Sequence, residues 1–552
     1  MLTPNAGPRG RRFVAPVVIG VIAALLLLWG LADKYLWQDE AQTAVLGARM
    51  LRFGRPLAYD GRNLVTIDIF AAEDTRTIGQ RTASAQAAID YYVRRGDFKS
   101  DTVWKFHPWG QFIVAAASFK VLGQTTLAAR LPFALAGLLT VLLLYRFMLV
   151  YFDSPLMAQL AAVFLLFNTY WILHMRQCRY YSLSSLFLVL TLMSYVLWQR
   201  RGLWGAVAFV IAAWCWFEVD YGTVWPVLGV LFVDAFVADR RNLWRPVLVG
   251  LALAASLAPF VYYYGLLGRL AVQEGTWPTR FRHTVFNMNE YVLPLPIVLA
   301  AVALIAWRWK NLPVAERRLP AIACGIMFAL ALWIPSVAPG AYLRYVIIAT
   351  PVACLLSAWV LVRGFNLHTT YVWLGAAIVV FTPWLSMPLD VLHPPLLWHL
   401  NNAVFRAELS ILRRETFGHR PDPNRIVIDW LKQNTVPTDE ILINYEDLPL
   451  MFYLPNPIRG GLGAFRVEDE SKNPPGVLVM RHSVAFVHWP VFQREIDRYR
   501  WIASPVNAPD VMWGNNPDPM AEAQDFNTER KVIVARRATG AENATKAPTL
   551  SW

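Results

Sequence analysis

Charged residues are scarce in this chain. Asp, Glu, Lys and Arg make up 16% of its 552 residues, whereas a soluble globular protein carries roughly a quarter. Hydrophobic residues make up 56%, and they gather in long runs that recur along most of the chain. This composition excludes an ordinary soluble domain and predicts a polytopic α-helical membrane protein.

Cysteine pairs and a signal-peptide cleavage site are both missing. The four cysteines contain no C-x-x-C pair, and three of them fall inside apolar runs, so neither a disulfide framework nor a zinc site is supported. Residues 13–31 form an apolar stretch after Arg9, Arg11 and Arg12, and no small-residue cleavage site follows it. We therefore expect a retained signal anchor there.

The net charge of +13 is not accompanied by a basic stripe with interleaved aromatic residues. Such aromatics stack on the bases in a single-stranded nucleic-acid site, so their absence argues against nucleic acid as a partner. The basic residues fall mainly in short loops between apolar runs and in a C-terminal region. Basic loops of this kind indicate membrane topology.

Apolar runs near the length that a bilayer requires predict about eleven transmembrane helices. Their expected bounds are 13–36, 127–150, 156–173, 181–198, 203–218, 221–238, 246–264, 291–308, 319–335, 343–362 and 371–387. Basic loops mark one side of these spans as cytoplasmic. The opposite side receives the segment 37–106, the turn 174–181, the loop 265–290 and the chain after about residue 388.

The chain changes character after residue 387. The tail, 388–552, is polar and alternates between helix-like and strand-like stretches, which are NRIVIDWLKQN, EILINY, VAFVHW, VFQREIDRYRW and KVIVARR. The alternation predicts a small C-terminal α/β domain outside the membrane. The transmembrane domain is then 1–387, with a first outer loop at 37–106 and an interfacial helix at 107–123.

Two adjacent carboxylates, Asp39 and Glu40, stand in the stretch WQDEAQTA just after the first apolar run. One interpretation is structural: Asp39 is the N-cap of a helix, Gln42 completes a capping box, and Gly54 ends the helix. This does not explain Glu40, nor an acidic pair at a membrane boundary, where desolvating a carboxylate is costly. In the functional interpretation, one carboxylate takes a proton from an acceptor hydroxyl, or both hold a divalent cation.

Five motifs follow one another along the chain: DEA, HPWGQF, ARLPFALAGLLTVLLLY, RQCRYYSL and YLRYVIIATP. In this order they resemble the polyprenyl-phosphate-sugar-dependent membrane glycosyltransferases of the GT-C fold. That group includes protein O-mannosyltransferases, the lipid A aminoarabinose transferase and the rhizobial galacturonosyltransferases. The resemblance implies transfer of a sugar from a polyprenyl-phosphate donor to a lipid, polysaccharide or protein acceptor, by a single inverting displacement.

The resemblance also implies roles for individual residues. Asp39 is the catalytic base, Glu40 supports the acceptor or a divalent cation, and His107 lies near the active site. Other side chains suit a lipid-linked sugar phosphate, because guanidinium groups bind phosphate oxygens bidentately. These substrate-binding residues are Arg176, Arg179, Tyr181, Arg344 and Tyr345. The structural alternatives are a helix-start residue for His107 and snorkelling for the arginines.

One departure from the family pattern concerns a second acidic residue. Some members carry a carboxylate near the turn that reads RQCRYY here, where this chain has none. Asp220, at the tip of EVDYG, is the candidate to supply it, and its structural alternative is a hairpin-turn residue.

The implied location is the bacterial inner membrane, with the active site and the C-terminal domain on the periplasmic side. The main alternative from another class is a transporter or flippase for a lipid-linked envelope precursor. It predicts ionisable residues at mid-membrane and an internal repeat, whereas the ionisable residues here crowd the outer helix ends and no repeat is visible. An envelope scaffold would leave the acidic pair unexplained.

Overall fold

The computed structural model describes most of the chain in two compact units. The described residues are 11–65, 85–238, 240–267, 275–386, 406, 408–418, 420–460, 475–481, 500–504, 506–511, 515–519 and 529–538. The helical unit comprises Met1–Leu31, Leu131–Tyr262 and Gln273–Gly418. The mixed unit comprises Ala32–Arg130, Tyr263–Val272 and His419–Trp552. The predicted first outer loop therefore belongs to the same unit as residues 419–552 of the C-terminal tail.

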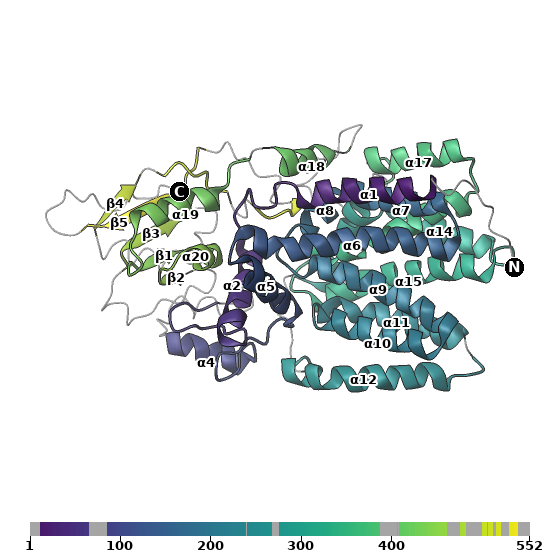
Figure 1. Ribbon diagram of the computed structural model, residues 1–552, viewed down its shortest axis with the longest axis horizontal. Helices are drawn as coiled ribbons and strands as arrows, with labels where there is room; N and C mark the ends of the chain where they lie inside the picture. The colour runs from purple at the N-terminus through teal and green to yellow at the C-terminus, as the bar shows by residue number, and fades with distance from the viewer. Residues whose placement is uncertain are drawn as a thin grey trace. The chain divides into compact units, whose positions relative to one another are not determined.

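The helical unit is built mostly from apolar helices, labelled in Figure 1. They are α1 (Arg11–Leu28), α6 (Thr126–Phe152), α7 (Pro155–Phe167), α8 (Thr169–Met175), α9 (Tyr181–Arg201), α10 (Leu203–Phe217), α11 (Tyr221–Ala238), α12 (Trp244–Tyr264), α13 (Trp277–Asn287), η2 (Met288–Val292), α14 (Leu295–Trp307), α15 (Val314–Val337), η3 (Leu343–Tyr345), η4 (Ile347–Ala349), α16 (Thr350–Trp359), η5 (Val360–Gly364), α17 (Thr369–Phe381) and α18 (Glu408–Phe417). Every predicted apolar segment overlaps at least one of these helices.

The helical unit makes the chain a multi-pass membrane protein, as predicted. Six segments are long and apolar enough to cross a membrane: α6, α9, α11, α12, Glu316–Val337 and Ile347–Gly364. Two bent pairs pass the same test, α7 with α8 (74°) and Trp277–Val292 with α14 (87°), so the described residues hold six to eight candidate spans. The expected number of about eleven stays a prediction, because α1, α10 and α17 are shorter apolar helices.

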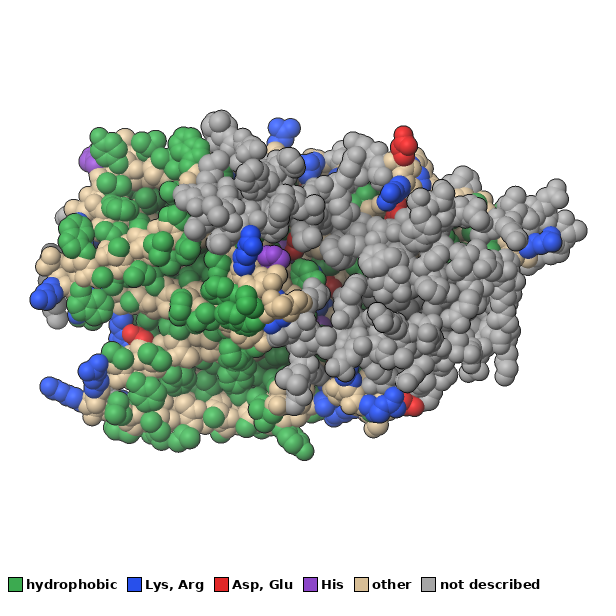
Figure 2. Space-filling model, turned by 180° about the vertical axis from the view of Figure 1, so that it is seen from behind, with side chains coloured by type: hydrophobic (Ala, Val, Ile, Leu, Met, Phe, Trp, Pro, Cys, Tyr) green, Lys and Arg blue, Asp and Glu red, His purple; other side chains and the backbone are tan. Residues whose placement is uncertain are grey.

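Large hydrophobic side chains lie exposed on the helical unit. Trp204, Tyr262 and Trp307 are 80%, 87% and 77% exposed. On the face shown in Figure 2, hydrophobic side chains cover the helices, and Lys and Arg side chains gather at their left end. Such a surface suits lipid contact, because soluble proteins rarely expose large contiguous apolar patches.

The mixed unit combines helices with a small sheet. Its helices are α2 (Gln38–Phe53), α4 (Ala85–Arg95), α5 (Gly110–Leu122), α19 (Pro423–Asn434) and α20 (Asp447–Tyr453). Its strands are β1 (Ile441–Ile443), β2 (Ile458–Gly460), β3 (Val477–Met480), β4 (Trp501–Ser504) and β5 (Ile533–Arg537), in the order β2-β1-β3-β5-β4. β1 runs parallel to β2 and β3, whereas β5 runs antiparallel to β3 and β4. The predicted α/β character of the tail is confirmed.

The predicted tail elements are found where they can be checked. α19 corresponds to NRIVIDWLKQN, β1 lies within EILINY and β5 lies within KVIVARR. The stretch VAFVHW lies outside the described residues, as does most of VFQREIDRYRW. The last residue of the latter, Trp501, begins β4.

The two central strands of the sheet are buried on both faces. Ile441 and Val477 pack in one cluster with apolar residues of α19 and α20, whereas Leu442 and Leu478 pack in a second cluster with Trp501. A strand covered on both faces needs no polar alternation. This explains the continuous apolar sequences ILI and VLVM.

Helices α2 and α5 approach each other closely at Gly47. A Cβ atom built on Gly47 lies 2.8 Å from the Ala115 Cβ and 3.3 Å from the Phe112 carbonyl oxygen. α2 then ends at Gly54, which adopts a left-handed conformation with φ 73°, as its sequence position predicts. Glycine is thus required at position 47 for space and at position 54 for backbone conformation.

Gly47→Ala is expected to lower the thermal unfolding midpoint of the purified protein, because overpacking typically costs about 1–3 kcal/mol. The matched control is Gly229→Ala, another helical position, where nothing lies within 4 Å of the added Cβ. Alanine is intrinsically the better helix former, so the control should unfold at the same or a higher temperature. Equal midpoints for the two variants would contradict the close packing of α2 on α5.

Candidate functional site

Helix α2 begins at Gln38, one residue before Asp39. Trp37 precedes the helix in an extended conformation, and its backbone N–H donates to the Glu40 carboxylate over 3.4 Å. The prediction that Asp39 is the N-cap is therefore wrong. Glu40, the third helical residue, reaches back to the chain before the helix, as Glu does in a capping box. Asp39 is half-buried in the first turn, where the helix dipole favours a carboxylate.

Glu40 is fully buried and forms an ion pair with Arg130 of α6. Arg130 Nε lies 2.8 Å from Glu40 Oε1, and Nη2 lies 2.6 Å from Oε2, so the pair is bidentate. Arg130 also donates to the carbonyl oxygens of Lys34 and Tyr35, at 2.8 and 3.2 Å. One guanidinium thus joins the start of α6, the start of α2 and the segment that leads into α2.

The Asp39–Glu40 pair does not fit a divalent cation. Both Glu40 oxygens accept hydrogen bonds from Arg130, and a cation would have to displace that guanidinium from a buried pair. Within the part of the chain that the structure describes, no group of three or more His, Cys, Asp or Glu side chains is placed to hold a metal. The geometry instead suits Glu40 to positioning α2.

Residues of the C-terminal tail hold the segment before α2. We call them the tail clamp: Asp422, Asn424, Asp429, Asp447, Tyr453 and Asn515. The Tyr35 N–H donates to Asp422 over 2.6 Å, and its hydroxyl donates to Asp429 over 2.8 Å. The Tyr35 carbonyl accepts from Asn515 Nδ2 over 2.7 Å. Its ring stacks on Tyr453, with centroids 4.0 Å apart.

The clamp continues to the first residue of α2. The Leu36 N–H donates to the Tyr453 hydroxyl over 3.1 Å, and the Leu36 carbonyl accepts from Asn424 over 3.3 Å. The Gln38 amide donates to Asp447 Oδ1 over 2.8 Å and accepts from the Leu448 N–H over 3.3 Å. Since Asp39 is the next residue on a helix, the tail fixes the backbone that carries it.

Asp447 is a buried acid at the end of this clamp. It is 1% exposed, and burial raises its pKa to about 6. Its neighbour Glu446 is fully buried, and its ion pair with Arg481 measures 2.6 Å. Burial raises the pKa of Glu446 as well. Both carboxylates therefore bind protons more readily than exposed ones.

His107 lies half-buried just before α5, among aromatic rings. It stacks on Trp104 with centroids 5.9 Å apart and meets Phe106 edge-on at 4.7 Å. α5 is joined to α2 by the Thr43 hydroxyl, which donates to Gln111 over 2.9 Å. His107 thus precedes a helix that packs on the Asp39 helix, and its part in substrate binding stays a prediction.

Arg176 of the helical unit binds the carboxyl end of α1. Its Nη1 and Nη2 each lie 2.6 Å from a carbonyl oxygen, those of Leu26 and Trp29. The last carbonyls of a helix have no partner within the helix, so Arg176 satisfies one of them at Leu26 and binds a second carbonyl, at Trp29, just after the helix. These contacts supply a structural reason for an arginine here, and its role in phosphate binding stays a prediction.

Four predicted substrate-binding residues surround Tyr180, between α8 and α9. Tyr180 lies within electrostatic range of Arg179, Tyr181, Asp220 and Tyr345. The Arg179 guanidinium lies 5.5 Å from the Tyr180 ring centroid, and the Tyr181 ring centroid lies 4.6 Å from it. The structure therefore gathers residues from three separate motifs of the helical unit.

Asp220 and Arg344 each make contacts of their own. Asp220 accepts from the Gly222 N–H over 3.0 Å, from Ser184 over 3.3 Å and from the Thr223 hydroxyl, so it starts α11 as an N-terminal cap. Arg344 stacks over the rings of Tyr342 and Tyr345, at 4.4 and 5.5 Å. A second acidic role for Asp220 stays a prediction.

The predicted site residues divide between the two units. Asp39, Glu40 and His107 belong to the mixed unit, and the remaining six belong to the helical unit. Sequence reasoning missed Arg130, Tyr180 and Asp447. Arg130 had a detectable signal, because a charged residue near the start of a long apolar run needs a partner. Asp447 had none, since its partner Gln38 lies 409 residues away.

Solved structures confirm the expected GT-C fold. ArnT from Cupriavidus metallidurans, in a crystal structure with undecaprenyl phosphate bound, aligns with a TM-score of 0.55 at 14% sequence identity. The alignment covers 96% of this chain and 98% of that chain. The apo form of the same ArnT aligns with a TM-score of 0.55 at 14% identity, covering 94% and 97%. At this identity the likeness shows the fold alone.

No protein-family model matches the chain, and no curated protein matches its sequence.

Removing Arg130 is expected to destabilise the protein more than removing the whole ion pair. Arg130→Met leaves Glu40 buried and unpaired, which typically costs about 3–5 kcal/mol, whereas the double variant Glu40→Gln/Arg130→Met leaves no charge. Unfolding of the detergent-purified single and double variants measures the difference. The single variants are Arg130→Met and Glu40→Gln. If the loss in free energy of unfolding of the double variant equals the sum of the losses of these two, Arg130 and Glu40 are not coupled.

The pKa of Asp447 predicts a pH-dependent stability. Its folded pKa of about 6 lies above the ordinary value of 3.8, so the unfolded chain releases this proton first as pH rises. The contribution of Asp447 to the free energy of unfolding is therefore fully present below about pH 4, and it is lost as the pH rises to about 6. Asp447→Asn should flatten the fall in unfolding midpoint between pH 4 and 6, and Asp33→Asn, at an exposed carboxylate, should not. An unchanged slope in Asp447→Asn would contradict the assignment.

Proposed function

We propose that this protein is a membrane glycosyltransferase that moves a sugar from a polyprenyl-phosphate donor to a lipid, polysaccharide or protein acceptor. The observation that carries the proposal is Asp39: a half-buried carboxylate on a helix start that Glu40, Arg130 and the tail clamp hold in place. The fold shared with ArnT, which was crystallised with undecaprenyl phosphate, supports a lipid-phosphate donor. The sugar and the acceptor are left open by these observations.

The proposed reaction is a single displacement at the anomeric carbon. Asp39 takes the proton from the acceptor hydroxyl, the acceptor oxygen bonds to the anomeric carbon, and the bond to the phosphate oxygen breaks with its electron pair. The leaving phosphate gains negative charge as this bond breaks. Arg179 and Arg344 are the proposed cations for that charge, because a preorganised guanidinium stabilises the developing anion. The product has the inverted anomeric configuration.

Arg176 is proposed for a different part. Two of its guanidinium nitrogens bind the carbonyls of α1, so we propose that it fixes the turn that carries Arg179. Glu40 is likewise proposed to act through position rather than through chemistry. The proposed location is the bacterial inner membrane, with Asp39 and the tail on the periplasmic side, as the basic loops indicate.

Asp39→Asn is expected to reduce sugar transfer by about 10²–10⁴-fold, the usual contribution of a general base. The assay incubates purified protein with a panel of radiolabelled polyprenyl-phosphate sugars and measures transfer or hydrolysis. Asp33→Asn is the matched control, because it removes the same charge from an exposed position in the neighbouring segment.

Three outcomes would count against the proposal or its mechanism. If Asp39→Asn transfers sugar as fast as wild type, Asp39 is not the base. If no donor reacts while reconstituted protein moves the lipid-linked donor across vesicles, the transporter interpretation takes its place. A product that retains the donor configuration excludes the single displacement.

A further inference from the structure

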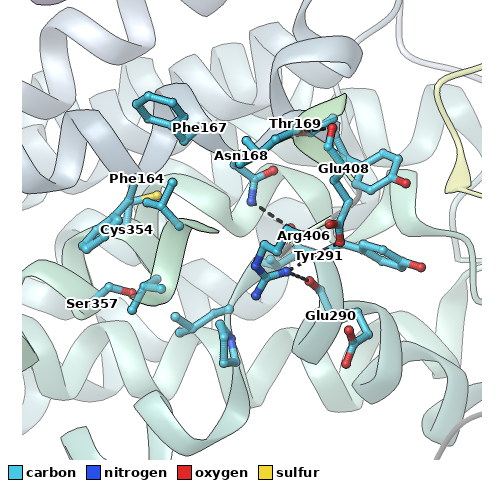
Figure 3. A pocket seen from close by; sticks show the side chains of 17 residues that line it. Phe164, Phe167, Asn168, Thr169, Glu290, Tyr291, Cys354, Ser357, Arg406 and Glu408 are labelled. Atoms are coloured by element: carbon cyan, nitrogen blue, oxygen red, sulfur yellow. Dashed lines mark hydrogen bonds and ion pairs between the residues drawn. The ribbon is translucent and has the colours of Figure 1, made fainter. Parts of the chain in front are cut away.

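The pocket at the start of α14 is a junction of helix ends whose charges are satisfied. Its cavity of about 70 Å³ has room for a few water molecules. Figure 3 shows Arg406 and Glu408 in its wall, where their side chains pair at 3.6 Å. Arg406 also donates to the carbonyl oxygens of Thr382 and Glu290, both over 3.1 Å. Arg406 and Glu408 therefore have their partners within the protein.

The opposite end of α14 differs, because basic side chains gather there. α14 ends at Trp307, α15 begins at Val314, and both helices or their ends pack near the π-helical turn η5. Four cations from these segments form a group that we call the basic cluster: Arg308, Lys310, Arg317 and Arg363. The basic loops of the sequence predict that this end of the helices faces the cytoplasm.

Contacts between three segments hold the basic cluster together. Arg308 Nη1 donates to the Arg363 carbonyl oxygen over 3.2 Å. Arg363 Nε lies 3.6 Å from an oxygen of Glu316, in the first turn of α15. Arg317 donates to the Trp309 carbonyl oxygen, and its guanidinium lies 4.3 Å from the centroid of the Trp309 ring. The end of α14, the start of α15 and η5 therefore share one surface.

The basic cluster carries more positive charge than the neighbouring side chains neutralise. Backbone carbonyls satisfy single donors of two of its arginines, but a carbonyl does not cancel the charge of a guanidinium. Glu316 is the only acidic residue in the sequence from 291 to 389. On α11, which packs on α15, Asp234 already pairs with Arg318 at 2.6 Å. Four cations thus stand against one carboxylate, so the cluster is complementary to an anion.

Exposed apolar side chains lie beside the same cluster. Trp307, Trp309 and Phe365 are all exposed around it, and tryptophan is enriched where helices meet the surface of a membrane. Leu299 and Val302 of α14 are exposed as well, and they continue the apolar surface along the helix. A ligand that fits this place therefore has an anionic group at the cluster and hydrocarbon chains beside α14.

We propose that the basic cluster binds the headgroup of an anionic phospholipid of the cytoplasmic leaflet. Its arginines donate charge-assisted hydrogen bonds to the phosphate, and the acyl chains lie along the exposed face of α14. A zwitterionic headgroup is disfavoured, because its ammonium meets four cations. The proposal does not rest on glycosyl transfer, since no residue of the basic cluster belongs to the Tyr180 cluster or to the mixed unit.

The test is native mass spectrometry of delipidated, detergent-purified full-length protein. Phosphatidylglycerol and phosphatidylethanolamine with identical acyl chains are added at equal concentration, so only the headgroup differs. Wild type should retain phosphatidylglycerol at least about fivefold better, the ratio that one basic residue at an anionic membrane surface provides. An excess of soluble glycerol phosphate, which has no acyl chain, should leave the lipid bound. Equal retention of the two lipids, or displacement by the soluble compound, overturns the proposal.

Two variants change the charge of the basic cluster in opposite directions. Lys310→Gln, at an exposed position, should lower the preference for phosphatidylglycerol by up to about fivefold. Glu316→Gln removes the one carboxylate and should raise the preference. The matched control is Arg241→Gln, which removes a positive charge from an exposed position in another basic loop, between α11 and α12, and should keep the preference. If Arg241→Gln lowers it as much as Lys310→Gln does, basic loops in general attract the lipid and the proposal is wrong.

Discussion

The bidentate ion pair between Arg130 and Glu40 fixes the part of the chain on which the proposed chemistry depends. A buried carboxylate and a buried guanidinium are each expensive to desolvate, so the pair holds only with good geometry and with the remaining donors satisfied. Arg130 meets both conditions, since its other N–H groups bind the carbonyls of Lys34 and Tyr35. The same residue therefore neutralises Glu40 and anchors the chain leading into α2. Asp39, which precedes Glu40 in α2, is therefore held in position by the contacts of Arg130.

The tail clamp adds a second restraint from the far end of the chain. Tyr35, Leu36 and Gln38 bind side chains of the tail through backbone and side-chain groups alike. A segment without regular structure has unpaired N–H and C=O groups that need partners, and here the tail supplies them. This gives the C-terminal domain a physical role that its sequence does not show: it orders the backbone next to the proposed base.

The sequence predicts this protein well where a local pattern decides, and poorly where distant residues do. The bounds of α11 follow from an apolar run that begins just after Asp220, and α19 follows from its helical periodicity. The interruption at Asn168 is different. Residues 156–173 look like one apolar run, but the chain bends by 74° inside them, where Asn168 caps the start of α8 and also donates to the Tyr291 carbonyl. Periodicity cannot show such a partner.

Asp39 of the acidic pair is a second example in which distant residues decide a local structure. An aspartate before an apolar helical face is a good N-cap by residue type, yet the helix begins at Gln38, because Glu40 reaches back to Trp37 while Arg130 holds it. Asp447 is the first residue of α20, and its partner is distant in the sequence. Its role in the tail clamp depends on the hydrogen bond from Gln38, and only the fold brings these two residues together.

Three of the described arginines share one structural task, and that task changes how the sequence should be interpreted. Arg130, Arg176 and Arg406 each donate to carbonyl oxygens where the chain leaves or enters a helix. In lipid a helix end cannot rely on water for its last carbonyls, and a guanidinium has enough donors to bind two of them and a third group as well. An arginine in an apolar or outward-facing stretch is therefore as compatible with a capped helix end as with a phosphate site. Arg179 and Arg344 contact aromatic rings, and they stay the proposed phosphate ligands.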